Sequence, residues 1–256
     1  MKKILLSIIA LLALAAPLCA QTLDEVLARN YQARGGLDKL KVLAGWKLSG
    51  KMAVAAQGLE LPVVIWQKAP DKLRVETTFQ EKKIVQAFDG RQPWWIMPFL
   101  SGDAQPLPPE QDKQFREQAV FENPLVTFGE KGYKLELLGK EEMDGKPVFK
   151  LKLVKVDGRE IFYYLDAASG LELKSSLLLK TGESESLLEI LYGDPRPVNG
   201  LMLFFAVDNR LNGQPQMQMT FDEIEINPAM GDALFAMPDR KDAAGEKEAP
   251  RKKNRK

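Results

Sequence analysis

The chain lacks the residues of the commonest catalytic and metal sites. It contains no histidine, and its single cysteine, Cys19, lies close to the N-terminus. A Ser-His-Asp triad, a Cys-His dyad and a zinc site of His and Cys ligands therefore cannot be assembled from it. We expect no catalysis, no metal and no cofactor.

The N-terminus has the pattern of a cleaved secretory signal peptide. Two lysines precede thirteen largely apolar residues at 4–16, and small residues precede Gln21. This run is shorter than the about 20 residues of a membrane-spanning helix, and Pro17 interrupts it. We expect residues 1–20, including Cys19, to be removed on export. The alternative is lipidation of Cys19, although a proline and a leucine stand where a lipobox has small residues.

Charge separates the last residues from the rest of the mature chain. Residues 21–239 carry a net charge of −6, whereas 240–256 hold eight Lys/Arg and three Asp/Glu, a net of +5. The acidic body has no basic footprint for nucleic acid. We expect the basic tail to be disordered, because it has too few apolar residues to form a core. The alternative is weak contact with anionic lipid, worth about 1 kcal/mol per basic residue.

Two short helices are predicted at the start of the mature chain. Apolar residues recur at helical spacing between Leu23 and Tyr31, and Thr22 and Glu25 form a capping-box pair. A second helix is predicted over 37–43. Both are amphipathic and can cover another apolar surface.

From residue 46 the hydrophobic period changes to two, which predicts half-buried strands joined by Asp-Gly and Asn-Gly turns. A proline-rich loop and a polar helix interrupt this pattern at 106–121. We therefore expect one mainly β domain over 21–239, an antiparallel sheet of about 11–12 strands with covering helices. The strands are expected at 46–54, 60–68, 72–79, 82–89, 93–97, 133–139, 147–156, 159–165, 171–180, 184–192, 201–211 and 215–226.

Four segments resemble the LolA-type lipoprotein carriers of the bacterial periplasm. Residues 87–99 (AFDGRQPWWIMPF) resemble the family's strand, Asp-Gly turn, aromatic strand and Pro-Phe pair. Residues 68–74, 164–171 and 234–238 resemble its Lys-x-Pro strand end, its Asp-x-x-x-Gly-Leu hairpin and its closing Phe-x-x-Pro. The order of these pieces between residues 23 and 238 carries the resemblance. One departure is Ala69, which stands where the carriers have an arginine linked to ligand handling.

The resemblance implies a LolA-like half-open barrel with an apolar cavity that shields acyl chains. It further implies a monomeric carrier in the periplasm of a Gram-negative-type bacterium, moving a lipoprotein or lipid towards the outer membrane between inner- and outer-membrane transfer proteins. Strand parity and aromatic content select the residues expected to line the cavity. They are Trp46, Leu48, Met52, Leu73, Val75, Phe79, Phe88, Trp94 and Phe99.

Other interpretations of the same residues stay open. Each tryptophan and methionine can equally be core packing. Trp94 and Trp95 are adjacent on one strand, so only one of them can face inward. A sensor or scaffold of the same fold would bind a protein instead of lipid. A carboxylate-dependent envelope hydrolase could draw on Glu141, Glu142, Asp166, Glu189 or Asp222, although acidic residues this numerous are usually solvated surface.

Overall fold

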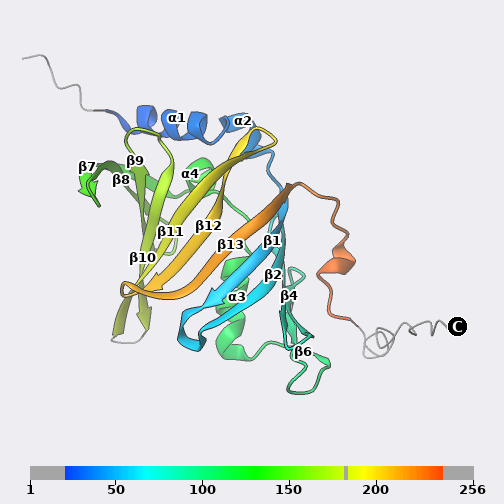
Figure 1. Cartoon of the computed structure of the whole chain (residues 1–256). Helices are drawn as coiled ribbons and strands as arrows, with labels where there is room; N and C mark the ends of the chain where they lie inside the picture. The colour runs from blue at the N-terminus through cyan, green and yellow to red at the C-terminus, as the bar shows by residue number, and fades with distance from the viewer. Residues whose placement is uncertain (1–20, 182–183, 239–256) are drawn as a thin grey trace, which may run out of the picture.

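The computed structural model describes residues 21–181 and 184–238. Thirteen strands form one sheet in the order β6-β5-β4-β3-β2-β1-β13-β12-β11-β10-β9-β8-β7, and every pair of neighbours is antiparallel. The sheet curls into a half-open barrel, with α3 and α4 behind it in Figure 1. The expected signal peptide and the expected tail, 240–256, lie outside the described residues.

The strands follow the predicted meander with small shifts of boundary. They are β1 (Gly45–Val54), β2 (Leu59–Lys68), β3 (Lys72–Phe79), β4 (Lys82–Phe88), β5 (Pro93–Ile96), β6 (Ala104–Pro106), β7 (Lys134–Met143), β8 (Lys146–Val154), β9 (Glu160–Asp166), β10 (Glu172–Thr181), β11 (Ser184–Val198), β12 (Leu201–Leu211) and β13 (Gln214–Ile226). The helices are α1 (Leu23–Ala33), α2 (Leu37–Lys41), α3 (Pro109–Ala119) and α4 (Pro124–Thr127), with 3₁₀ turns η1 (Ala55–Gln57) and η2 (Asp232–Leu234).

Two differences from the expected strands have physical causes. The short edge strand β6 was expected to be loop, because Pro106 and its neighbours carry no alternating pattern. β11 was expected to end at Tyr192, yet it continues through Pro195 and Pro197. Its pairing with β10 stops at Leu191, so the later residues pair only with β12. Proline is tolerated there because the strand has a side without a ladder.

Helix α1 begins at the predicted capping box, in which Thr22 and Glu25 bond each other's backbone N–H groups. Its buried side chains include Val26 and Leu27. Asn30, also buried, donates from Nδ2 to the Gly170 carbonyl oxygen at 2.9 Å. These contacts fix α1 across one end of the half-barrel, which we call the helix end (Figure 1).

A buried ion pair adds to this attachment. Arg34, at the C-cap of α1, donates from Nη1 to Glu172 Oε1 of β10 at 2.9 Å and from Nε to the Met202 carbonyl oxygen at 2.9 Å. The two charged side chains are only 11% and 6% exposed. The pair therefore joins α1 to two strands that neighbour β11 on either side.

The open end of the half-barrel lies opposite α1. Because the strands form an antiparallel meander, the β1–β2, β3–β4, β5–β6 and β12–β13 turns all point away from the helix end (Figure 1). We call these four turns, with the described residues at the end of β10 and the start of β11, the turn rim. Among the described residues, no helix has the length and apolar character needed to cross a membrane.

Glu172→Leu should destabilise the fold by about 3–5 kcal/mol, because it leaves the Arg34 guanidinium buried without its carboxylate. Urea unfolding followed by circular dichroism measures the change in the free energy of unfolding. The double variant Arg34→Met/Glu172→Leu should lose less than the single variant. Glu185→Leu, which removes an exposed partner of Lys180, should cost at most about 1 kcal/mol. Equal losses for Glu172→Leu and Glu185→Leu would contradict the assigned role of the buried pair.

Candidate functional site: an apolar concave face

The two faces of the sheet have opposite chemistry. Leu48 pairs with Ile65 on one side and Ile224 on the other, and Met52 pairs with Leu61 and Met219. Paired residues point to the same face. Within β1, β2, β12 and β13, all of them fully described, the positions that share this face carry no charged side chain. We call it the concave face, because the helices pack against it.

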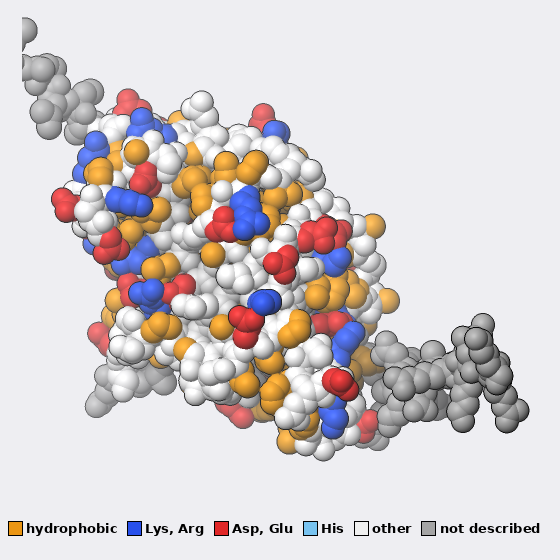
Figure 2. All heavy atoms as spheres, in the orientation of Figure 1, with side chains coloured by type: hydrophobic (Ala, Val, Ile, Leu, Met, Phe, Trp, Pro, Cys, Tyr) orange, Lys and Arg blue, Asp and Glu red, His pale blue; other side chains and the backbone are white. Residues whose placement is uncertain are grey.

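The opposite, convex face carries cross-strand ion pairs. Lys51 contacts Glu60 at 2.8 Å and Lys174 contacts Glu189 at 2.9 Å. Further convex pairs are Lys47–Glu225, Lys83–Glu76 and Lys152–Glu160. Figure 2, drawn from the same side as Figure 1, shows basic and acidic side chains adjacent to one another over this face. Solvated pairs of this kind keep a face in water and do not define a ligand site.

Charged residues on the concave side occur at its margins. Lys82 follows the β3–β4 turn, and Lys140 lies on the edge strand β7 above the Phe149 ring. Asp194 and Arg196 form an exposed pair near the β11–β12 turn. The centre of the concave face is therefore uncharged and mostly apolar, with Asn209 as a polar residue between Ile190 and Met217.

Helices cover part of this face. α1 and α4 pack on β8 and β9 through Leu27, Leu125 and Leu151. Leu40 of α2 joins a second cluster with β1, β12 and β13. α3 covers β3 and β4, where Phe115 meets Leu73.

Several apolar side chains on the same face belong to none of the four buried clusters of the described chain. Six of them, all half-buried, lie between the covering helices and the turn rim. We call them the apolar floor: Met52, Leu61, Leu177, Leu188, Ile190 and Met217. The pairing between strands shows which face these side chains occupy. Ile190 pairs with Ser175, and Ser175 pairs with Tyr163, which packs against α1, so Ile190 points to the same face as Tyr163. The floor is a partly exposed apolar surface outside the buried clusters.

The structure brings most of the predicted lining residues to this face. Leu48, Leu73 and Phe88 are buried beneath the helices, and Trp46 and Val75 are half-buried beside them. The Trp46 ring lies 4.9 Å from that of Phe121. Met52 belongs to the floor. Phe79 lies at the turn rim, in edge contact with Phe99 at 5.7 Å between ring centroids. Their contact with a ligand stays a prediction.

The structure corrects the placement of Trp94. Trp94 pairs with Ala87 and is fully buried on the convex face with Val85. Its Nε1 donates to the Phe235 carbonyl oxygen at 2.8 Å. Trp95 is the tryptophan of the pair that faces inward, against the α3 cluster. Sequence parity could not decide between the two, because neither neighbouring position on this four-residue strand is polar.

Five floor residues are absent from the predicted lining: Leu61, Leu177, Leu188, Ile190 and Met217. Leu61 and Met217 were available from the alternation in β2 and β13. The other three lie in uninterrupted apolar runs, Leu177 to Leu179 and Leu187 with Leu188, or beside Leu191. Polar and apolar residues do not alternate in such runs, so the sequence does not show which face each side chain occupies. That face depends on pairing with the neighbouring strand.

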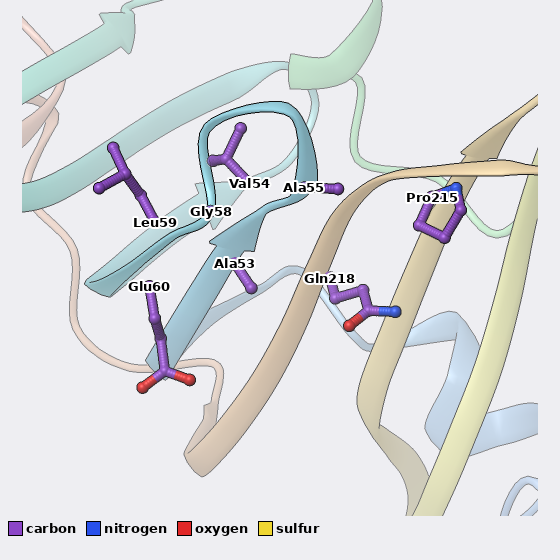
Figure 3. A pocket seen from close by; sticks show the side chains of 8 residues that line it. All are labelled: Ala53, Val54, Ala55, Gly58, Leu59, Glu60, Pro215 and Gln218. Carbon is purple, nitrogen blue, oxygen red and sulfur yellow. The ribbon is translucent and has the colours of Figure 1, made fainter.

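A small depression lies beside the β1–β2 turn at the turn rim (Figure 3). Its volume is about 210 Å³, and Ala53, Glu60 and Gln218 contribute to its wall. Pockets for drug-sized ligands measure roughly 300–1,000 Å³. The depression is too small for an acyl chain by itself, so the candidate site is the broader floor.

The carboxylates considered for a hydrolase do not converge. Glu141 and Glu189 pair with different lysines on different strands. Asp166 accepts from the backbone N–H of Ser169 and of Ala168, which holds the pKa of its carboxyl below the usual value. No group of three or more acidic or cysteine side chains placed to hold a metal occurs within the described ranges.

Solved structures share this architecture at low sequence identity. A LolA superfamily protein from Nitrosomonas europaea aligns with a TM-score of 0.56 and 16% identity, over 85% of this chain and 98% of that one. The chain has a LolA-like fold. A domain named for outer membrane lipoprotein sorting, from Vibrio parahaemolyticus, shares the LolA-like fold with a TM-score of 0.54 and 12% identity, over 82% and 94% of the two chains.

A DUF1329 family protein from Desulfovibrio piger also shares the LolA-like fold, with a TM-score of 0.55 and 10% identity, over 81% and 95% of the chains. No protein-family model and no curated protein sequence matches the chain. The half-open barrel predicted from the sequence is confirmed, with 13 strands where 11–12 were expected.

The segment after β13 closes the convex side of this LolA-like fold. Asp232 Oδ1 contacts Lys72 Nζ at 2.8 Å and Lys68 Nζ at 2.9 Å, and Arg74 donates to the Leu234 carbonyl oxygen. The two ammonium groups lower the pKa of Asp232 to about 2. This attachment keeps Phe235 over Trp94.

Asp232→Asn should lower the melting temperature at neutral pH by a few degrees or less, because the contacts are exposed and screened. A carboxyl with a depressed folded pKa stabilises the fold above its unfolded pKa, so the gap between wild type and variant should shrink as pH falls from about 4 towards 2. Circular dichroism melts across this range measure it. Asp222→Asn, at an exposed position, is the control and should show no gap. A gap independent of pH would contradict the electrostatic explanation.

Proposed function

We propose that this chain is a periplasmic carrier that shields the acyl chains of a lipid or lipoprotein on its concave face during transit towards the outer membrane. The observation that carries the proposal is the apolar floor, a half-exposed hydrocarbon surface on the face that holds no charge at its centre. Soluble proteins rarely leave such a surface bare without a partner for it. The LolA-like fold and the expected signal peptide support the location.

Energetics favour exchange over tight capture. Burying an acyl chain is worth about 0.8 kcal/mol per CH₂ group, and a bilayer offers the same gain. A carrier must therefore match the bilayer closely, with a lining that adapts to different chains. Met52 and Met217 suit this role because methionine is flexible and polarisable. Membrane-bound transfer proteins are the partners expected to load and unload such a carrier.

Ala69 bears on how release would work. It lies in the β2–β3 turn at the helix end, where its N–H donates to the Ala44 carbonyl oxygen at 2.8 Å. Its methyl side chain can form no hydrogen bond to a covering helix. We propose that release here depends on partition of the acyl chain between floor and acceptor, with no coupled step at this position.

Met52→Lys should weaken binding of a fluorescent fatty acid more than tenfold, because it places a charge in the apolar floor. Fluorescence titration of protein purified without detergent measures the dissociation constant. Ala53→Lys is the matched control: the next residue of β1 points to the convex face, where it pairs with Glu60 and Gln218. It should leave binding unchanged.

Native mass spectrometry of the same preparation should show a bound mass that organic solvent removes. A wild-type protein that is empty and never binds the probe would overturn the carrier proposal, and a stable protein partner would favour a sensor or scaffold. Loss of binding in Ala53→Lys alone would move the site to the depression of Figure 3.

A further inference from the structure

The β5–β6 loop, residues 97–103, displays apolar side chains to solvent. Leu100 is 76% exposed and Phe99 is 46% exposed. No charged residue occurs from Met97 to Gly102. The loop lies at the turn rim, at the lower end of the molecule in Figure 1 and opposite α1.

This loop is internally ordered. The Met97 carbonyl oxygen accepts from the N–H of Leu100 at 3.0 Å and of Gly102 at 3.1 Å. Ser101 Oγ accepts from Gln105 Nε2 at 3.0 Å and from the Asp103 N–H. The backbone N–H groups of Leu100, Gly102 and Asp103 thus find acceptors within the loop, which lowers the cost of moving them out of water.

Packing holds Phe99 at the rim. Its ring meets that of Phe79 at 5.7 Å, and Lys82 Nζ lies 4.7 Å from its centroid. Phe79 lies two residues beyond Thr77, which pairs with Val63. It therefore continues the concave row towards Leu61 and Met52. Apolar side chains thus lead from the loop through Phe99 and Phe79 to the floor, with Lys82 beside the two rings.

The turn rim carries other exposed apolar side chains. Leu178, Leu179 and Leu187 of the β10–β11 hairpin are each at least 38% exposed. Leu178 and Leu179 are adjacent on one strand, so they point to opposite faces. An extended lipid surface can contact side chains on separate hairpins and on both faces at once, whereas one cargo chain on the floor cannot reach them all.

We propose that the turn rim docks on a lipid bilayer, with Phe99 and Leu100 entering the outer part of the leaflet. The inference rests on the carrier proposal for its purpose: a chain leaving the bilayer would pass Phe99 and Phe79 to the floor without crossing water. Lys82 then lies at headgroup level, where a lysine keeps its ammonium in water. The docked face is the open end, and α1 faces away from the membrane.

Leu100→Asp tests this directly, because Leu100 packs against no buried cluster of the described chain. The probe is a phosphatidylcholine vesicle in high salt, which screens any attraction of the basic tail. Co-sedimentation should show at least a tenfold loss of vesicle binding relative to wild type. Val42→Asp, at a position 68% exposed at the helix end, is the matched control and should bind like wild type.

Fatty-acid titration separates this inference from the carrier proposal. Leu100→Asp should bind free fatty acid in solution as wild type does. Wild-type protein that binds fatty acid but no vesicle, or equal vesicle binding by Leu100→Asp and wild type, would overturn docking and leave the carrier intact. If the wild-type protein binds vesicles but takes up no fatty acid, the result would support docking and overturn the carrier proposal. Equal losses in Leu100→Asp and Val42→Asp would also overturn the assignment.

Discussion

Side chains along each strand alternate between two faces, and this chain uses the alternation to keep charge and hydrocarbon apart. Lys47 and Lys51 point to the convex face, while Leu48 and Met52, which follow them in sequence, point to the concave face. The ion pairs of the convex face make it compatible with water. The apolar concave face must then be covered by helices, by the curl of the sheet or by a ligand. The positions of the helices and the curl of the sheet follow from this requirement.

The helices meet the demand only in part. α1, α2 and α4 pack at the helix end, and α3 covers β3 and β4, but the floor nearer the turn rim stays partly exposed. A sheet of thirteen strands with two free edges stays open on that side. The edge strand β7 is charged and bulged near Gly139, which discourages pairing with another chain. Phe99 and Leu100 of the rim are among the exposed apolar side chains of the described chain, as is Val42 at the helix end.

Local patterns predicted the parts of the fold that depend on neighbouring residues. These parts are the capping box at Thr22, the Asp-Gly and Asn-Gly turns and the alternation in β1 and β3. The residues that form each pattern are only a few positions apart in sequence, and each pattern is found as expected. Failures occur where the decisive partner is distant in sequence. Trp94 is buried beneath Phe235, and the extension of β11 past Tyr192 depends on β12 and on the end of β10.

The sequence by itself determined the class of the protein: a mainly β chain without histidine, with one-sided strands and an N-terminal helix to cover them. It also placed Met52 and Phe79 on the concave face. Only the tertiary structure decided which tryptophan faces inward, which leucines of the long apolar runs form the floor, and where the helices leave that floor bare. The physical reason is that period two assigns a residue to one of two faces, whereas only pairing and packing between distant segments decide what lies opposite that face.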